Sequence, residues 1–300
     1  MMSSTIRTEN LTKKFRRVDA LNGLNLDVSD GAIYALVGPN GAGKTTAIKI
    51  LMNIFGPTNG RATVLGMDST RLAGRAFTAI AYVSENQELP GWMRVDGFMA
   101  YLRPFYPSWD RDLENELVLQ FALPLDRKLK HLSRGMRMKA AFASSLAYHP
   151  KLIVLDEPFG GLDPLVRDEL IEGMLERATE ATIFISSHDL TEVETFASHV
   201  GYLEQGRLRF SEQMATLTER FREVELTFDI SPALPEKWPA TWILPTSSAA
   251  VVRFIETHFD AERSRAEIQK IFSNVRDVTF TPMSLRSIFL AMAKAGREAA

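Results

Sequence analysis

Residues 38–46, which read GPNGAGKTT, have the types and spacing needed to bind a polyphosphate. Glycines in such a loop let backbone amides close on phosphate oxygens, and a helix N-terminus that follows adds its dipole. The Lys44 ammonium would contact the β and γ phosphates during catalysis, and the Thr45 hydroxyl would ligate Mg²⁺. We therefore expect ATP and Mg²⁺ as cofactors, with the nucleotide bound by the whole loop: Gly38, Pro39, Asn40, Gly41, Ala42, Gly43, Lys44, Thr45 and Thr46.

Two further stretches could supply the groups that cleave a phosphate anhydride. In KLIVLDEPFGGLDP, Asp156 would hold the metal ion and Glu157 would polarise an attacking water. In ATIFISSHDL, His188 follows an apolar run and could bridge to a γ-phosphate. An isolated histidine at such a position is as often a structural residue, so its assignment depends on the other two clusters.

An α/β sheet would bring these three stretches together. The runs 32–37 and 152–155 are continuously apolar, as expected of parallel strands that are buried on both faces. Apolar residues at positions 48 and 50–52 indicate a helix directly after the loop. Because α/β sheets bind ligands at the carboxyl ends of their strands, we expect one site at that edge.

Composition excludes several classes of function. The net charge of −2 offers no general attraction to nucleic acid, and we expect no nucleic-acid partner. The chain has no cysteine, which excludes disulfides and thiolate chemistry. Residues 1–10 lack the apolar core of a signal peptide, and no run approaches the roughly 18 apolar residues of a membrane span. We therefore expect a cytoplasmic chain.

The motifs, in this order, resemble those of the ATP-binding cassette (ABC) ATPases over roughly residues 4–215. GPNGAGKTT is similar to the Walker A motif, LIVLDEP to Walker B with its catalytic glutamate, and SSHD to the switch-histidine segment. GGLD resembles the D-loop, with Asp163, and LSRGM stands where the family has its LSGGQ signature. The resemblance implies an α/β P-loop NTPase of the ABC type. Its predicted domains are a nucleotide-binding core (1–85 and 151–217), a helical signature subdomain (86–150) and a small C-terminal α+β accessory domain (218–300).

The signature motif implies a second copy of the chain. In the family, two cassettes pack head to tail, and each signature closes over the ATP held by the other's phosphate loop. Ser133 and Gly135 would therefore contact the partner's nucleotide. By family position, Phe15 would stack on adenine, which needs only an aromatic face, and the alternative is a core phenylalanine.

Several residues depart from the family pattern. Arg134 replaces the first signature glycine and Met136 the signature glutamine. Glu85 occupies the usual Q-loop glutamine position, where a carboxylate could still ligate Mg²⁺ but adds negative charge near the γ-phosphate. Gln87 is the alternative if the loop register shifts.

The remaining segments favour a transporter subunit. The stretch from Tyr106 to Asp110 resembles a branch of exporters related to bacterial antibiotic-response transporters. Most aromatic residues of 86–150 fit a hydrophobic core, whereas Trp92, and less clearly Trp109, could line a groove for a helix of a membrane partner. Residues 222–229 alternate as a strand, and positions 285, 288, 289 and 292 form an amphipathic helix.

We therefore expect the ATP-hydrolysing subunit of an exporter, held at the inner face of the membrane by a separate integral-membrane permease. The alternative is a soluble ABC ATPase of the translation or DNA-repair type. A single phosphate loop and the short interval before the signature disfavour those two types. A P-loop kinase or GTPase would leave the signature unexplained.

Overall fold

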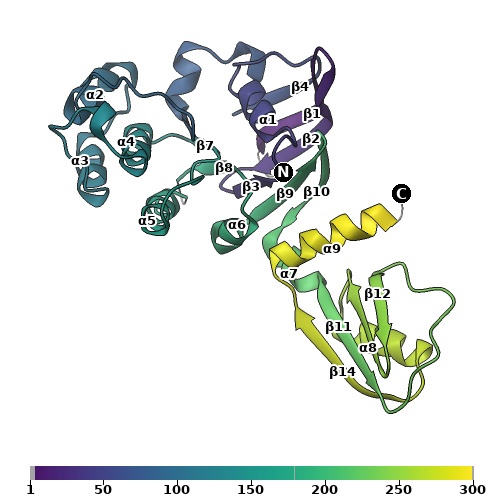
Figure 1. Cartoon of the computed structure of the whole chain (residues 1–300). Helices are drawn as coiled ribbons and strands as arrows, with labels where there is room; N and C mark the ends of the chain where they lie inside the picture. The colour runs from purple at the N-terminus through teal and green to yellow at the C-terminus, as the bar shows by residue number, and fades with distance from the viewer. Residues whose placement is uncertain (1–3, 179, 299–300) are drawn as a thin grey trace. The chain divides into compact units, whose positions relative to one another are not determined.

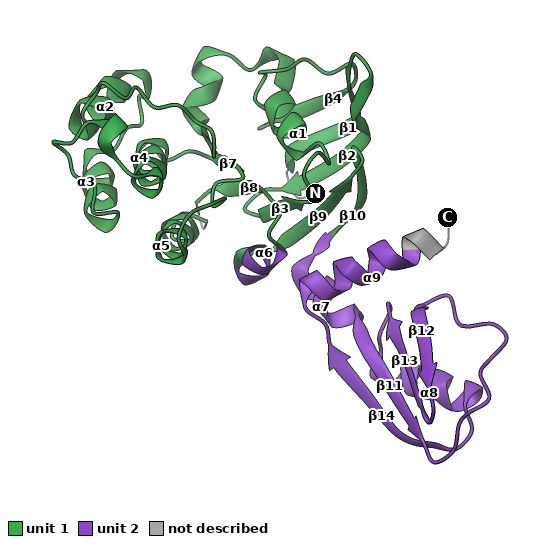
Figure 2. Cartoon of the chain, in the orientation of Figure 1, with its two compact units in different colours: residues 1–189, 196–211 green, residues 190–195, 212–300 purple. Residues whose placement is uncertain are grey.

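The computed structural model describes residues 4–178 and 180–298, and the chain divides into two compact units (Figures 1 and 2). The first unit contains the chain up to Asp189 together with Phe196–Ser211, and the second contains Leu190–Thr195 and the chain from Glu212 onward. The predicted domain limits at 85/86, 150/151 and 217/218 remain predictions, and residues 1–3, 179 and 299–300 lie outside the described residues.

A six-stranded sheet forms the centre of the first unit, in the order β10-β9-β3-β8-β7-β6. The strand β3 pairs in parallel with β8 and β9, and β7 pairs in parallel with β6 and β8. The apolar runs at β3 and β7 are buried almost throughout, as expected of a parallel sheet covered on both faces. The strands are β3 (Ile33–Val37), β6 (Ile80–Ser84), β7 (Leu152–Asp156), β8 (Thr182–Ser187), β9 (His199–Glu204) and β10 (Arg207–Gln213).

A second, antiparallel sheet of this unit has the order β2-β1-β4-β5. Its strands are β1 (Ser4–Phe15), β2 (Val18–Ser29), β4 (Asn59–Val64) and β5 (Met67–Asp68). The helix α1 (Lys44–Leu51) packs against β2 and β4 of this sheet and against β7 of the other. One apolar core therefore joins the two sheets through α1, and it fixes where that helix begins.

Three of the four α-helices described between β6 and β8 begin with a side-chain cap. Ser133 accepts a hydrogen bond from Met136 N at the start of α4, and Asp163 does the same for Val166 N at α5. Asp110 caps α3. The helices are α2 (Val95–Leu102), α3 (Arg111–Gln120), α4 (Arg134–Leu146) and α5 (Pro164–Leu175), and the 3₁₀ turns of the unit are Ser69–Arg71, Gly74–Ala79, Arg103–Phe105 and Leu129–His131.

The second unit contains a four-stranded antiparallel sheet in the order β12-β13-β11-β14. Alternate residues of β11, Val224, Leu226 and Phe228, are buried in a core with Ile268 and Phe272. The elements are α6 (Leu190–Phe196), α7 (Met214–Arg220), β11 (Arg222–Phe228), β12 (Trp242–Ser248), β13 (Val251–Glu256), α8 (Ala261–Ile271), β14 (Val275–Pro282) and α9 (Leu285–Glu298).

The structure confirms the predicted α/β class with a small α+β appendix. The predicted strand 222–229 and the predicted C-terminal helix coincide with β11 and α9. No helix among the described residues is long and apolar enough to cross a membrane.

Candidate functional site

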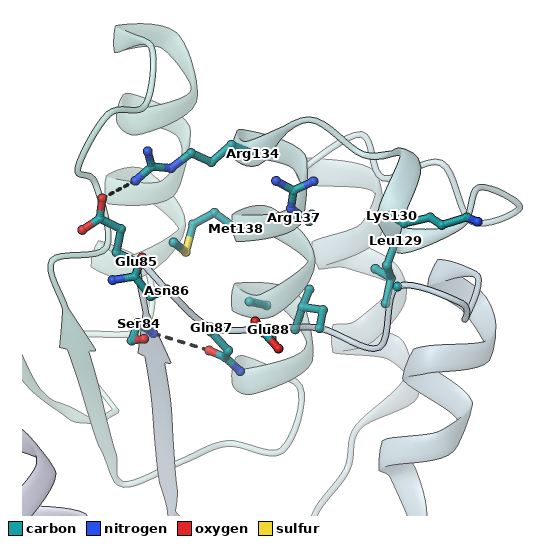
Figure 3. A pocket seen from close by; sticks show the side chains of 13 residues that line it. Ser84, Glu85, Asn86, Gln87, Glu88, Leu129, Lys130, Arg134, Arg137 and Met138 are labelled. Carbon is teal, nitrogen blue, oxygen red and sulfur yellow. Dashed lines mark hydrogen bonds and ion pairs between the residues drawn. The ribbon is translucent and has the colours of Figure 1, made fainter.

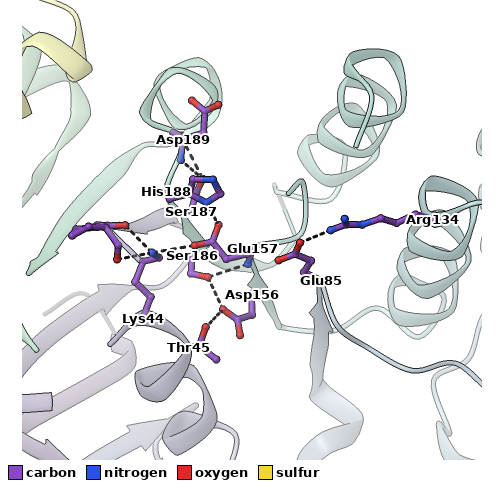
Figure 4. Close-up of polar contacts among 12 residues, drawn as sticks. Lys44, Thr45, Glu85, Arg134, Asp156, Glu157, Ser186, Ser187, His188 and Asp189 are labelled. Carbon is purple, nitrogen blue, oxygen red and sulfur yellow. Dashed lines mark hydrogen bonds and ion pairs between the residues drawn. The ribbon is translucent and has the colours of Figure 1, made fainter. Parts of the chain in front are cut away.

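The loop after β3 wraps around the Lys44 side chain (Figure 4). Lys44 is 5% exposed, and its Nζ donates to Gly38 O at 2.7 Å and to Pro39 O at 3.3 Å. A Cβ on Gly38 would lie 2.1 Å from Leu203 O, and one on Gly43 would lie 2.4 Å from Ala20 O. The backbone passes too close to its neighbours for any side chain, so both positions require glycine.

Asp156 lies at the carboxyl end of β7 and faces two hydroxyl groups. The hydroxyls of Thr45 and Ser186 donate to its Oδ1 at 3.0 and 2.7 Å. Burial raises the pKa of Asp156 above its usual range, the two hydrogen bonds oppose that shift, and the neighbouring charge of Glu157 adds to it. A carboxylate and a hydroxyl at this place are the oxygen ligands that Mg²⁺ prefers, so Asp156 and Thr45 fit the predicted metal ion.

Glu157 stands between a cation and an imidazole. Its Oε1 lies 3.1 Å from Lys44 Nζ, and its Oε2 lies 2.7 Å from His188 Nδ1. The Glu157 backbone is left-handed, with φ of 51°, and its N–H donates to the Ser186 hydroxyl at 3.0 Å. A left-handed backbone conformation is unfavourable for a non-glycine residue and is typical of functional sites.

A cavity of about 420 Å³ lies at this site, and Asp156 and Ser186 are not among its lining residues. Its lining includes residues 40–46 of the loop, Glu85, Glu157 and His188. The carboxyl ends of β3, β7 and β8 thus bring together the three stretches that the sequence analysis singled out.

Phe15, the predicted adenine platform, is not in the lining of this cavity, whereas Val18 and Ala20 of β2 are. The Phe15 ring is 39% exposed and packs edge-on against Phe55, with centroids 5.5 Å apart. Adenine stacking on Phe15 stays a prediction. Sequence reasoning missed Val18 and Ala20, which carry no motif, and Ser186, which the SSHD stretch contains.

The predicted signature and D-loop residues also lie outside the lining of the cavity. Ser133 is exposed at the start of α4, where it caps the helix, and Asp163 is exposed at the start of α5. Gly135 is buried, and a Cβ on it would lie 3.0 Å from the Val166 side chain. Ser133 and Asp163 therefore lie on surface outside the cavity of the phosphate loop, whereas Gly135 is buried.

Glu85 follows β6 and forms an ion pair with Arg134 of α4 (Figure 4). Its backbone N–H donates to Asp156 O at 3.0 Å, which fixes the residue beside the end of β7. Gln87, the alternative, accepts a hydrogen bond from Ser84 N at 3.4 Å and does not line the cavity. Of the two candidates, the structure brings Glu85 into the site.

A groove of about 580 Å³ lies beside the cavity, between the segment after β6 and α4 (Figure 3). Residues 84–89 line one wall, and Arg134, Arg137 and Met138 line the other. Trp92, which lies near this segment in sequence, is 69% exposed. Trp109 instead donates its indole N–H to Glu114 at 2.7 Å, so it has a packing role.

The similarity of the chain to known proteins agrees with this geometry. The family model for ABC transporters matches residues 21–160. The bacitracin transport ATP-binding protein BcrA of Enterococcus faecalis is 33% identical over 240 residues, which cover 77% of this chain and 76% of that protein. The daunorubicin/doxorubicin resistance ATP-binding protein DrrA of Streptomyces peucetius is 29% identical over 307 residues, which cover 96% of this chain and 92% of that protein.

Among solved structures, the dimeric structure of the ABC transporter cassette MJ0796 has a TM-score of 0.63 at 23% identity, and the match covers 70% of this chain and 98% of that one. The resemblance inferred from the motifs is thus confirmed. The chain belongs to the ABC transporter family and is an ATP-binding subunit with the ATPase core of that family.

Proposed function

We propose that this ATPase subunit powers an exporter whose membrane-spanning part is a separate polypeptide. The observation that carries the ATPase role is the convergence of Lys44, Asp156 and Glu157 at one sheet edge. The names of BcrA and DrrA, a bacitracin transport protein and a drug-resistance protein, support the exporter assignment. They do not favour a soluble translation or DNA-repair factor.

The phosphate loop is suited to bind the triphosphate of ATP through its backbone amides and Lys44. Thr45 and Asp156 would hold Mg²⁺, which would neutralise charge on the phosphates. Glu85 lines the same cavity and is a further candidate ligand.

Glu157 is the proposed general base. Glu157 Oε1 lies 3.1 Å from Lys44 Nζ, so a γ-phosphate bound in the loop would compete with Glu157 for that ammonium group. Once released, Oε1 could accept a proton from the attacking water, while His188 holds Oε2 through the 2.7 Å contact. The lysine and histidine thus set the orientation of the carboxylate from its two sides.

The exposed Ser133 of the signature supports a head-to-tail dimer. Ser133 and Gly135 at the start of α4 would cover the nucleotide held by a second copy, with Asp163 near the same surface. The groove beside α4 and the exposed Trp92 would face the integral-membrane permease. In this arrangement the chain lies in the cytoplasm, at the inner face of the membrane.

Substitution of the base tests this proposal. Glu157→Gln should retain ATP binding and lose phosphate release by a factor of about 100 or more, because the amide cannot take the proton. Fluorescent-nucleotide titration and a phosphate-release assay measure the two properties separately. Glu172→Gln, an exposed position on α5, is the matched control. Phosphate release near the unsubstituted rate in Glu157→Gln would assign the base to another residue.

A further inference from the structure

Two residues that depart from the family pattern, Glu85 and Arg134, form an ion pair with each other. Glu85 replaces the usual glutamine after β6, and Arg134 replaces the first glycine of the signature. The residues are 49 positions apart, and Arg134 Nη2 donates to Glu85 Oε1 (Figures 3 and 4). Arg134 is the first residue of α4, so its side chain extends from the start of that helix to the segment after β6.

Glu85 is placed where its charge matters to a bound nucleotide. Its side chain lines the cavity of the phosphate loop as well as the neighbouring groove, whereas Arg134 lines only the groove. The hydrogen bond from Glu85 N to Asp156 O keeps the residue at that wall. Its carboxylate is therefore the second in the lining of the cavity, with that of Glu157.

The loop after β7 leaves room for the ion pair. A Cβ on Gly160 would lie 3.1 Å from Glu85 Oε1, and one on Gly161 would lie 2.7 Å from Arg134 Nη1. Two successive glycines therefore let the carboxylate and the guanidinium meet above this loop. The contact thus involves three segments that are distant in sequence.

An unpaired, negatively charged carboxylate at this wall would repel the negatively charged triphosphate. Lys44 and the backbone amides of the phosphate loop are the positive groups that would attract the triphosphate to this cavity. We propose that Arg134 is a positioning residue: it neutralises Glu85 and holds its carboxylate towards α4, which permits a triphosphate to bind beside it. This role rests on the proposed binding of ATP in the cavity.

A double-mutant cycle on the full chain tests this role. The probe is a fluorescent ATP analogue titrated in EDTA, so that only the charge of Glu85 is measured and not its affinity for a metal ion. Arg134→Gln alone should weaken binding about three- to fivefold, because it leaves the carboxylate unpaired. In a Glu85→Gln background, the same substitution should have no effect, since no carboxylate remains to be neutralised.

Two further variants separate the role from a structural one. Arg134→Lys should restore most of the affinity, because it keeps the charge. Arg137→Gln, one turn along the same helix and on the same groove, should bind as the unsubstituted chain in both backgrounds.

An equal loss from Arg134→Gln with and without the Glu85 carboxylate would overturn the proposal, because Arg134 would then act on the nucleotide directly or only on the fold. No loss in either background would also overturn it. If the unsubstituted chain bound no analogue at all, the proposed function itself would fail, which is a different result from either of these.

Discussion

At the scale of single residues, the site contains a buried carboxylate, that of Asp156, which is unfavourable for folding. Asp156 is 6% exposed and lies beside Glu157, which also carries a carboxylate. Burial raises the pKa of Asp156, so folding makes the charged form of this carboxyl less favourable in free energy. A residue that destabilises the fold at the position proposed for the metal ion fits a functional role better than a structural one.

Asp156→Asn should therefore stabilise the chain while it abolishes magnesium-dependent ATPase activity. The amide oxygen can still accept from Thr45 and Ser186, and the buried charge is gone. We expect the unfolding midpoint at pH 7 to rise by about 2–4 °C, as about 1 kcal/mol produces in a domain of this size. Because the native pKa is raised, the cost is present above it and disappears as the pH falls through it. The rise in the unfolding midpoint caused by Asp156→Asn should thus become smaller as the pH falls towards 4. A lower midpoint at pH 7 would show that the charge contributes to stability.

The residues of the site differ in how far sequence could predict them. Lys44, Asp156, Glu157 and His188 lie in motifs whose chemistry depends on residue type and spacing. The structure brings Lys44, Glu157 and His188 to one cavity, with Asp156 in contact with Thr45 of its lining. The Ser186 hydroxyl was not predicted, since a serine in a strand carries no signal of which carboxylate it will face.

At the scale of elements, the helical part of the first unit depends on one buried carboxylate. Glu114 of α3 accepts from Arg103 Nη2 at 2.6 Å and from Trp109 Nε1 at 2.7 Å. Tyr106 stacks on Tyr148 at a centroid distance of 3.9 Å, and Asp110 caps α3. The stretch from Tyr106 to Asp110, from which the exporter branch was inferred, therefore has a structural purpose within this fold.

Glu114→Gln should destabilise the chain by about 1.5–3 kcal/mol at pH 7, measured by urea unfolding, because Arg103 loses its charged partner. Burial alone would raise the pKa of Glu114, but the hydrogen bonds from Arg103 and Trp109 outweigh it and the pKa is lowered. The stabilisation is thus complete above the usual glutamate range and lost as the pH falls through the native pKa. The difference in the free energy of unfolding between the unsubstituted chain and Glu114→Gln should therefore become smaller at acidic pH.

Glu116→Gln is the control for this prediction, because its side chain is 63% exposed on the same helix and its pair with Arg177 is partly solvated. Its effect should stay below about 1 kcal/mol. Equal effects of the two substitutions would show that Glu114 has no special role.

The sequence predicted whether a segment is a helix or a strand more readily than which other segments it packs against. Continuous apolar runs identified β3 and β7 as buried parallel strands, and alternation identified β11. The order β10-β9-β3-β8-β7-β6 could not be predicted in the same way, because it depends on packing between segments that are distant in the chain. The contact of Glu85 with Arg134 was missed for the same reason: each residue was recognised only as a separate departure.

At the scale of the whole molecule, the central claim is that two copies of the chain build each active site. Ser133 is exposed and does not line the cavity of its own chain, which contains Lys44 and Glu157. Ser133 of the signature therefore lies outside the cavity in which its own chain would hold a nucleotide. A head-to-tail dimer would give it a nucleotide to contact and would place two composite sites at the interface.

The direct test is a mixing series of two inactive variants. Ser133→Arg should leave nucleotide binding by the monomer nearly unchanged and prevent ATP-dependent dimerisation. Ser133→Ala removes the hydroxyl, both as helix cap and as proposed contact to the partner's nucleotide, so its effect separates loss of the hydroxyl from the bulk and charge of the arginine. Lys44→Ala should bind ATP weakly, because it lacks the cation of the phosphate loop.

A mixed head-to-tail dimer contains one site with both lesions and one with neither. If one intact site turns over alone, each mixed dimer should have about half of the unsubstituted ATPase rate; if mixed dimers form as readily as pure ones, about half of the dimers in an equimolar mixture are mixed, and the whole mixture should reach about a quarter of that rate. Light scattering reports dimerisation at each ratio. No recovery at any ratio, together with a loss of nucleotide affinity in the Ser133→Arg monomer, would contradict the account, because the signature would then act within its own chain.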